Sequence, residues 1–149
     1  MQFEEVIEKD YMIFVDTCSF IQKDSEKTFG EIAPKMIAYK RKIIMLKSVQ
    51  NEISKHLYYK NPKLKDKFLV ELDKADLIEI DMEFDSSFAD NDFQTLFTKL
   101  RLKYKLCLIT NDFNLSKDIL KLKSSKSIHK VKGIKIFRVS PKGLIDFEK

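Results

Sequence analysis

The sequence contains no apolar run that approaches the roughly 20 residues needed to span a bilayer. Its N-terminus also lacks the pattern of a secretory signal peptide. Only two cysteines occur, Cys18 and Cys107, and neither lies near the other or near a histidine, which argues against a zinc site. These absences favour a cytoplasmic protein with reduced, buried thiols and no membrane partner.

The length and the apolar content are sufficient for one folded domain. The chain has 149 residues, of which 44% are hydrophobic, and this excludes a disordered chain and predicts a single domain over residues 1–149. No internal repeat or linker divides it. The formal net charge of +5 suits a polyanionic partner such as nucleic acid, although a lysine-rich surface that serves solubility explains it equally well.

Short apolar segments alternate with helical patterns along the chain. The apolar segments predict strands at 11–15, 43–46, 106–109 and 134–139, and the alternating segment 77–82 predicts a further short strand. We expect helices at 29–39, 48–57, 68–75, 90–100 and 115–123, with Ser48 as an N-cap, residues 23–28 as a loop and residues 144–147 as a short tail element. Strands that alternate with helices predict right-handed β-α-β units and a parallel sheet, so the fold class is α/β.

The segment 105–118, KLCLITNDFNLSKD, carries the clearest functional pattern. Its apolar run predicts a buried strand, and Thr110, Asn111 and Asp112 then form a polar turn before a helix resumes. In open α/β sheets, ligands bind just beyond the carboxyl ends of the strands. Asp112 is therefore predicted to serve function rather than packing.

Three further acidic positions occupy comparable places. Asp16 directly follows the first strand, Glu52 lies in the helix after the second, and Asp90 or Asp92 opens a later helix. Taken alone, an acid of this kind is often a helix cap or part of a solvated face. Together, the four can converge at one edge of a parallel sheet.

A cluster of carboxylates repels itself unless a cation neutralises it. Ligation by oxygen alone favours Mg²⁺ or Mn²⁺. Such an ion lowers the pKa of a bound water and stabilises charge on a phosphoryl oxygen. A phosphodiester is the substrate that this chemistry and a basic surface together predict.

The ordered set of motifs resembles the PIN-domain nucleases. The matching segments are VDTCSF at 15–20, SVQNEISKH at 48–56, FADNDFQTLF at 88–97 and LITNDFNLSKD at 108–118, and they spread over almost the whole chain. The resemblance implies a three-layer α/β/α sandwich with a central parallel sheet. It also implies an Mg²⁺- or Mn²⁺-dependent endoribonuclease that cleaves single-stranded RNA by attack of water, leaving 5′-phosphate and 3′-hydroxyl ends.

Carried over by position, the resemblance assigns roles to individual residues. The catalytic acids would be Asp16, Glu52, Asp90 and Asp112, and the metal ligands Asp16, Asp90, Asp92 and Asp112. Which of Asp90 and Asp92 is the main third ligand stays open. The supporting residues would be Thr17, Thr110 and Asn111, and the weaker candidates for contact with nucleic acid are Lys60, Lys63, Lys126 and Lys130.

The chain departs from the family pattern at two places. The segment between Asp90 and Asp112 is longer than is common by about one helical turn. Cys18 stands where a small hydroxyl or amide residue is frequent. Neither departure removes an expected ligand, but the second alters the contacts around Asp16, which matter to metal affinity.

Several functions are compatible with this pattern. A toxin that pairs with an antitoxin protein, an RNA-maturation enzyme and a defence nuclease all fit, with RNA or DNA as substrate and a homodimer as one assembly. A catalytically silent PIN-like binding module is the main alternative, although all four acidic positions are filled. A phosphoacceptor signalling domain is disfavoured because Asp16 is not part of an adjacent acidic pair.

Overall fold

The chain is organised around one six-stranded sheet. The computed structural model describes residues 2–21, 24–60, 76–81, 89–124 and 130–148, with residues 20–21 and 54–60 described by their backbone alone. The strand order across the sheet is β3-β2-β1-β4-β5-β6. The strands are β1 (Met12–Val15), β2 (Ile43–Leu46), β3 (Ile78–Asp81), β4 (Leu106–Ile109), β5 (Ile134–Ser140) and β6 (Gly143–Asp146).

The sheet is mostly parallel, and its central pair is β1 with β4. Val15 at the end of β1 lies opposite Ile109 at the end of β4, so the two strands finish on the same rung. All four residues of β4 are buried, as expected of a strand covered on both faces. Strand β6 is the exception, because it returns antiparallel to β5 through the turn before Gly143.

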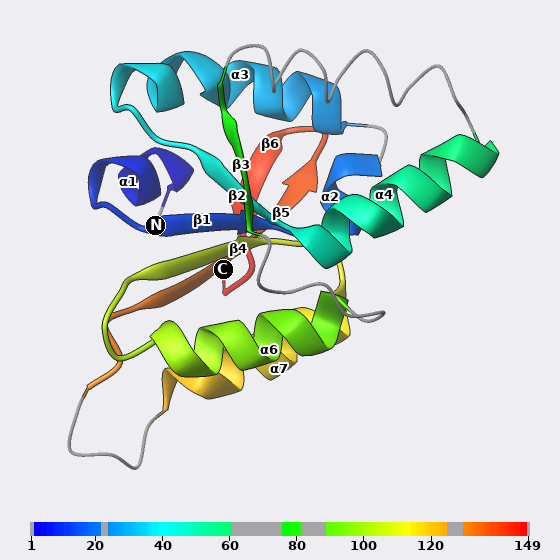
Figure 1. Ribbon diagram of the computed structural model, residues 1–149. Helices are drawn as coiled ribbons and strands as arrows, with labels where there is room; N and C mark the ends of the chain where they lie inside the picture. The colour runs from blue at the N-terminus through cyan, green and yellow to red at the C-terminus, as the bar shows by residue number, and fades with distance from the viewer. Residues whose placement is uncertain (1, 22–23, 61–75, 82–88, 125–129, 149) are drawn as a thin grey trace.

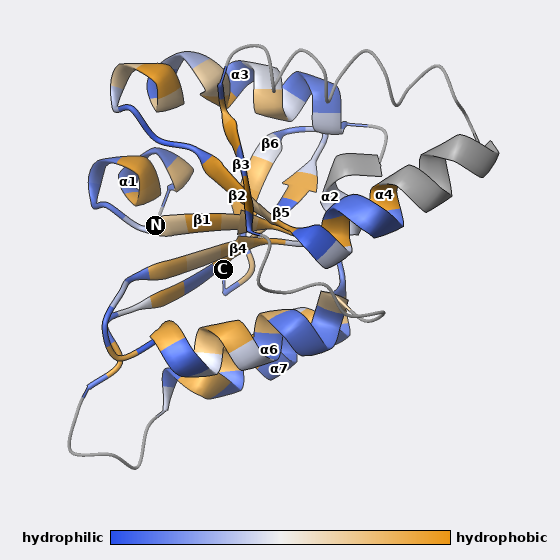
Figure 2. Ribbon diagram, in the orientation of Figure 1, coloured by the Kyte–Doolittle hydropathy of each residue, from blue (hydrophilic) through white to orange (hydrophobic). Residues whose placement is uncertain are grey.

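Helices cover both faces of the sheet, an arrangement compatible with a three-layer α/β/α sandwich. Figure 1 shows α1 (Phe3–Glu8) and α3 (Ser25–Ala38) on one side and α6 (Ala89–Leu100) and α7 (Phe113–Leu120) on the other. The short α2 (Thr17–Ile21) follows β1, α4 (Lys47–Lys60) follows β2, and a 3₁₀ turn at Lys121–Lys123 extends α7. Figure 2 shows apolar residues concentrated in the strands and on one side of α6.

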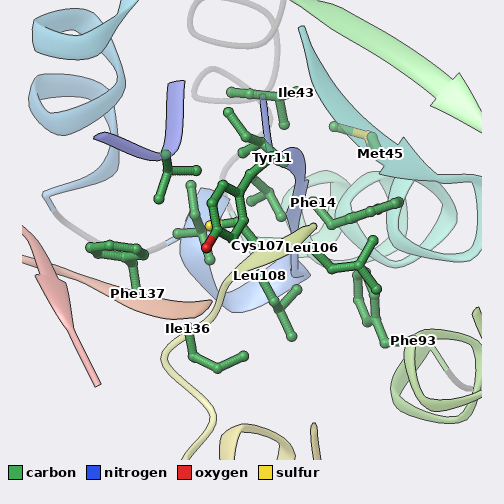
Figure 3. Packing of buried hydrophobic residues seen from close by; sticks show 14 of the residues in the cluster. Tyr11, Phe14, Ile43, Met45, Phe93, Leu106, Cys107, Leu108, Ile136 and Phe137 are labelled. Carbon is green, nitrogen blue, oxygen red and sulfur yellow. The ribbon is translucent and has the colours of Figure 1, made fainter. Parts of the chain in front are cut away.

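Aromatic rings join the helices to the sheet in the core. Phe97 of α6 contacts Phe14 of β1 edge to face, with ring centroids 5.3 Å apart. On the other face, Phe3 of α1 contacts Phe137 of β5 at the same separation. Figure 3 shows the side chains that pack around these strands, including the buried thiol of Cys107.

The expected strands are confirmed within one residue at either end. Segments 43–46 and 106–109 have the same bounds in the structure, and 134–139 gains Ser140. The expected helix at 115–123 is an α-helix from Phe113 followed by the 3₁₀ turn. The tail element at 144–147 is instead strand β6, and the helix expected at 68–75 lies outside the described residues.

Two local predictions are wrong. Helix α3 begins at Ser25 rather than Phe29, because residues of the expected loop are buried and the Ser25 hydroxyl donates to the Ser19 carbonyl. Pro34 lies inside this helix. Helix α4 begins at Lys47, so Ser48 is a buried helical residue and not the N-cap.

Within the described residues, no helix is both long enough and apolar enough to cross a membrane.

The Phe14–Phe97 contact predicts where the fold is most sensitive to truncation. Because Phe97 is fully buried against Phe14 and Phe93, we expect Phe97→Ala to lower the free energy of unfolding by about 3–5 kcal/mol. Urea denaturation measures this loss. Ile37→Ala is the control, because Ile37 is 56% exposed, and a comparable loss in that variant would contradict the placement of the core.

Candidate functional site

The candidate site lies where β1 and β4 end side by side. Asp16 is the first residue after β1, and its backbone N–H donates to the carbonyl of Ile109 at 2.9 Å. Thr110 is the first residue after β4, and its N–H donates to Phe137 of β5 at 2.9 Å. The parallel pairing therefore holds both residues at one edge of the sheet, which is the carboxyl edge expected for a ligand site.

Asp16 is a buried carboxylate held by three donors. The residue is only 5% exposed. One oxygen accepts from the Thr17 N–H at 2.7 Å, and the other accepts from the Thr110 hydroxyl at 2.9 Å and the Cys18 thiol at 3.4 Å. Burial raises the pKa of Asp16, the hydrogen bonds oppose this, and the nearby Glu52 carboxylate adds to the rise.

The Thr110 hydroxyl links the first and last acidic positions. It donates to Asp16 and accepts from the backbone N–H of Asp112 at 3.1 Å. Asn111 fixes the same turn to β5, since its amide nitrogen donates to the Val139 carbonyl and its amide oxygen accepts from the Val139 N–H, both at 2.9 Å. These hydrogen bonds hold the turn that carries Asp112.

Glu52 connects three helices at the site. One of its oxygens accepts from the Thr17 hydroxyl in α2 at 2.6 Å. The other accepts from the backbone N–H of Ala89, the first residue of α6, at 3.3 Å. A carboxylate on α4 therefore fixes the start of α6, which carries Asp90 and Asp92.

Asp112 is the N-cap of α7. Its side chain accepts from the Leu115 N–H at 3.0 Å, and its carbonyl accepts from the Ser116 hydroxyl at 2.8 Å. This satisfies one of the free N–H groups that begin a helix. Capping and a functional role are compatible, because only Oδ1 of the carboxylate accepts the capping hydrogen bond.

Asp90 shows that the four acidic positions share one electrostatic field. Its pKa is raised to about 6, first by desolvation of the carboxyl group and then by the negative charges of Asp16, Asp112 and Glu52. The residue is nevertheless exposed at the surface of α6. Asp92, in the same first turn, is 7% exposed and so faces the protein. Carboxylates from three other segments therefore act on Asp90.

The acids that interact electrostatically at this edge do not by themselves form a complete coordination shell for a metal ion. Across the described ranges, no three His, Cys, Asp or Glu side chains are arranged so that they could hold a metal ion. The side chains instead accept hydrogen bonds from Thr17, Thr110, Ala89 and Leu115. Mg²⁺ usually keeps several waters and takes one or two carboxylates plus substrate phosphate, so its binding does not need three protein ligands.

The structure describes only one of the candidate lysine contacts by its side chain. Lys130 is exposed just before β5. Lys60 is the last residue of α4, and its side chain is outside the described set. Lys63 and Lys126 lie outside the described residues.

Two further residues lie near the site: Cys18, which the sequence marked only as a departure from the family pattern, and Asp118, to which it gave no role. Cys18 lies 3.5 Å from the Thr110 hydroxyl, and its sulfur accepts from the Asn111 N–H at 3.2 Å, so its thiol fills the space between the two turns. Burial raises the pKa of this thiol, and the Asp16 charge adds to the effect. Asp118 of α7 is a further acid that raises the pKa of Asp90. Asp118 lies three residues after the buried Leu115, and residues three apart share one face of a helix. This spacing was the signal in the sequence that could have placed Asp118 on the face toward the protein.

The raised pKa of Asp90 predicts a pH-dependent cost to the fold. The folded protein holds the Asp90 proton up to about pH 6, whereas the unfolded chain releases it near 3.8. Ionisation of this group therefore lowers stability as pH rises between those values. Because solvent screens an exposed group, we expect Asp90→Asn to stabilise the protein at pH 8 by about 1 kcal/mol, or about 2–4 °C in Tm.

Thermal unfolding in a chelator, followed by circular dichroism, measures this gain. The gain should disappear below about pH 4, where the aspartate is protonated in both states. Glu31→Gln removes an exposed acid from α3 and should change Tm little at either pH. A gain that persists at low pH, or an equal gain in the control, would show that the cost of ionising Asp90 at the site is not the cause.

No protein-family model matches this chain, and no curated protein matches it significantly. What the site does must therefore be inferred from its own residues. Those residues are a buried Asp16, a capping Asp112, a Glu52 that fixes α6, and an Asp90 whose pKa is raised to about 6 by desolvation and then by the charges of the other carboxylates.

Proposed function

We propose that the protein is a metal-dependent endoribonuclease of the PIN type, which hydrolyses phosphodiester bonds of single-stranded RNA. The motif pattern supports this, as does the α/β architecture with its mostly parallel sheet. The observation that carries the proposal is the perturbed carboxyl group of Asp90, whose pKa is raised to about 6 by desolvation and then by the negative charges of Asp16, Asp112 and Glu52 from three other segments. A carboxyl group whose pKa is raised by burial and by other acids is typical of functional sites.

The donor set fits a hard divalent cation. Asp16 and Asp112 would hold Mg²⁺ or Mn²⁺ through carboxylate oxygen, with Asp90 or Asp92 of α6 as a further ligand, and oxygen donors are those that these ions prefer. When bound, the ion would lower the pKa of a water and stabilise negative charge on the phosphoryl group.

The chain's own residues would position and deprotonate the attacking water. Asp90, with a pKa of about 6, is largely ionised at neutral pH and is therefore suited to accept a proton. Glu52 would keep Asp90 in place, because it accepts from the first N–H of α6. Thr110 would keep Asp16 and Asp112 in a fixed relation through its hydroxyl.

The cellular role within this proposal could be that of a toxin, an RNA-maturation enzyme or a defence nuclease. A neighbouring gene for a small acidic or DNA-binding protein would favour the toxin, since such a protein would be its antitoxin. A homodimer is compatible with each of these roles. The basic net charge of +5 supports binding to an RNA backbone.

A second candidate is a PIN-like module that binds nucleic acid without cleaving it. One observation favours it: among the described side chains, no group of three is arranged to hold a metal ion. In that case the carboxylates would serve the fold through hydrogen bonds to Thr17, Ala89 and Leu115. The two experiments below separate the candidates.

Cleavage of a single-stranded RNA with Mg²⁺ or Mn²⁺ is the first experiment. We expect Asp16→Asn to reduce the cleavage rate by about a hundredfold or more. Mutation of a residue that only hydrogen-bonds to a metal ligand typically costs about 10–100-fold. Asp10→Asn is the matched control, because Asp10 is an exposed acid just before the other end of β1. Equal cleavage by wild type and Asp16→Asn, or cleavage that survives a chelator, would reject the enzyme.

Binding of the ion to the folded protein is the second experiment, and it does not depend on activity. Saturating Mn²⁺ should raise the Tm of wild type, since a ligand that binds only the folded state stabilises it by about 2.7 kcal/mol at a hundred times its Kd. Asp16→Asn and Asp112→Asn should each lose most of this shift, whereas Asp10→Asn should keep it. An unchanged shift in all variants would place the ion elsewhere.

A further inference from the structure

An exposed aromatic ring lies directly beside the candidate site. Phe113 is the first residue of α7 and follows Asp112 in the chain. It is 62% exposed, the largest value among the large hydrophobic residues that the structure describes. Full burial of such a side chain is worth about 1.5–3 kcal/mol, and this position forgoes most of that gain.

The ring is held by two neighbours rather than free in solvent. The Phe147 ring, just after β6, is tilted by 57° to it, with centroids 5.6 Å apart. The Lys117 ammonium lies 5.4 Å from the Phe113 centroid, one helical turn along α7. We call Phe113, Phe147 and Lys117 the aromatic platform.

The platform is continuous with the turn that carries the site. The Asn111 amide is paired with the backbone of Val139, and the next residue along β5 toward its start, Arg138, is exposed. The strand that this turn contacts therefore carries an exposed cation next to the contact point. Two acids flank Phe147 in sequence: Glu148 is paired with Lys123 at 2.8 Å, and the buried Asp146 lies 4.0 Å from the Lys135 ammonium, so both charges are partly offset.

We propose that the aromatic platform binds a nucleobase of single-stranded RNA and so positions the adjacent phosphodiester at the carboxylates. This inference rests on the proposed function. An exposed ring with a flexible cation over it matches the way proteins bind single strands, by stacking of bases on aromatic rings and contact of the backbone with cations. Adjacent Cα atoms are about 3.8 Å apart, so a nucleotide on Phe113 has its backbone within reach of Asp112.

The occupant favoured by charge is RNA rather than another protein. The Lys117 ammonium lies over the ring, and the whole chain carries a net charge of +5, so the platform itself attracts a polyanion, and a cation bound at the adjacent carboxylates would offset their negative charge. Stacking is tolerant of base identity because every base has an aromatic face. The platform would therefore fix the position of the strand without selecting its sequence.

Fluorescence offers a direct test because the chain contains no tryptophan. Phe113→Trp places a single indole on the platform, and Tyr104→Trp is the matched control, because Tyr104 is 49% exposed at the opposite end of β4. Both are made together with Asp16→Asn so that the probe, a single-stranded RNA of about 12 nucleotides, is not consumed. We expect the RNA to quench the indole at 113 and not the one at 104.

Affinity provides the second measurement. In the same Asp16→Asn background, Phe113→Ala should weaken RNA binding by about 5- to 150-fold, the range for loss of one stacked base. Phe113→Tyr should restore it, and an oligonucleotide of the same length without bases should bind Phe113→Ala and its parent equally. In the active protein, Phe113→Ala should raise KM more than it lowers kcat.

The outcomes separate the platform from the nuclease. Asp16-dependent cleavage together with unchanged RNA affinity in Phe113→Ala would overturn the platform alone. Unchanged affinity with a change in molecular mass by ultracentrifugation would assign the ring to a protein interface and also overturn it. If neither wild type nor the Asp16→Asn protein binds or cleaves RNA, both proposals fail.

Discussion

The structure depends on the parallel pairing of β1 with β4. Because Val15 and Ile109 end on the same rung, the residues that follow them, Asp16 and Thr110, must meet at one edge of the sheet. Apolar packing on both faces, such as Phe97 of α6 against Phe14, holds this pair in place. The core therefore fixes negative charges close together that would separate in a less constrained chain.

Hydrogen bonds moderate the repulsion without removing it. Thr110 and Thr17 donate to Asp16 and oppose the rise in its pKa that burial causes. Thr17 also donates to Glu52, so one short helix, α2, serves two carboxylates through its first residue. The negative charges of the other acids still act on Asp90, where they add to the rise in pKa that desolvation causes. Repulsion between carboxylates that remains at the edge of the sheet lowers stability, and such a loss is the usual cost of a binding site for a cation or a polar substrate.

Much of the sheet was predictable because its strands are continuous apolar runs, such as residues 43–46 and 106–109. Strand β6 was not, because Leu144 and Ile145 are a short apolar pair whose pairing depends on β5. The start of α3 was missed because Ser25 and Thr28 are polar yet buried. The positions of the acids after strands and at helix starts were enough to predict that they lie at one edge of the sheet. Contacts such as that of Glu52 with the Ala89 N–H depend on tertiary packing, and no local sequence pattern indicates them.

The central claim is that the carboxylates at this edge bind a divalent cation. Diffraction from crystals grown with Mn²⁺ and single-stranded RNA, analysed for the anomalous signal of the metal, tests it most directly. The account predicts an anomalous peak with Asp16 or Asp112 oxygens at about 2.1–2.2 Å. A peak bound only by other residues, or no peak at saturating Mn²⁺, would contradict the account.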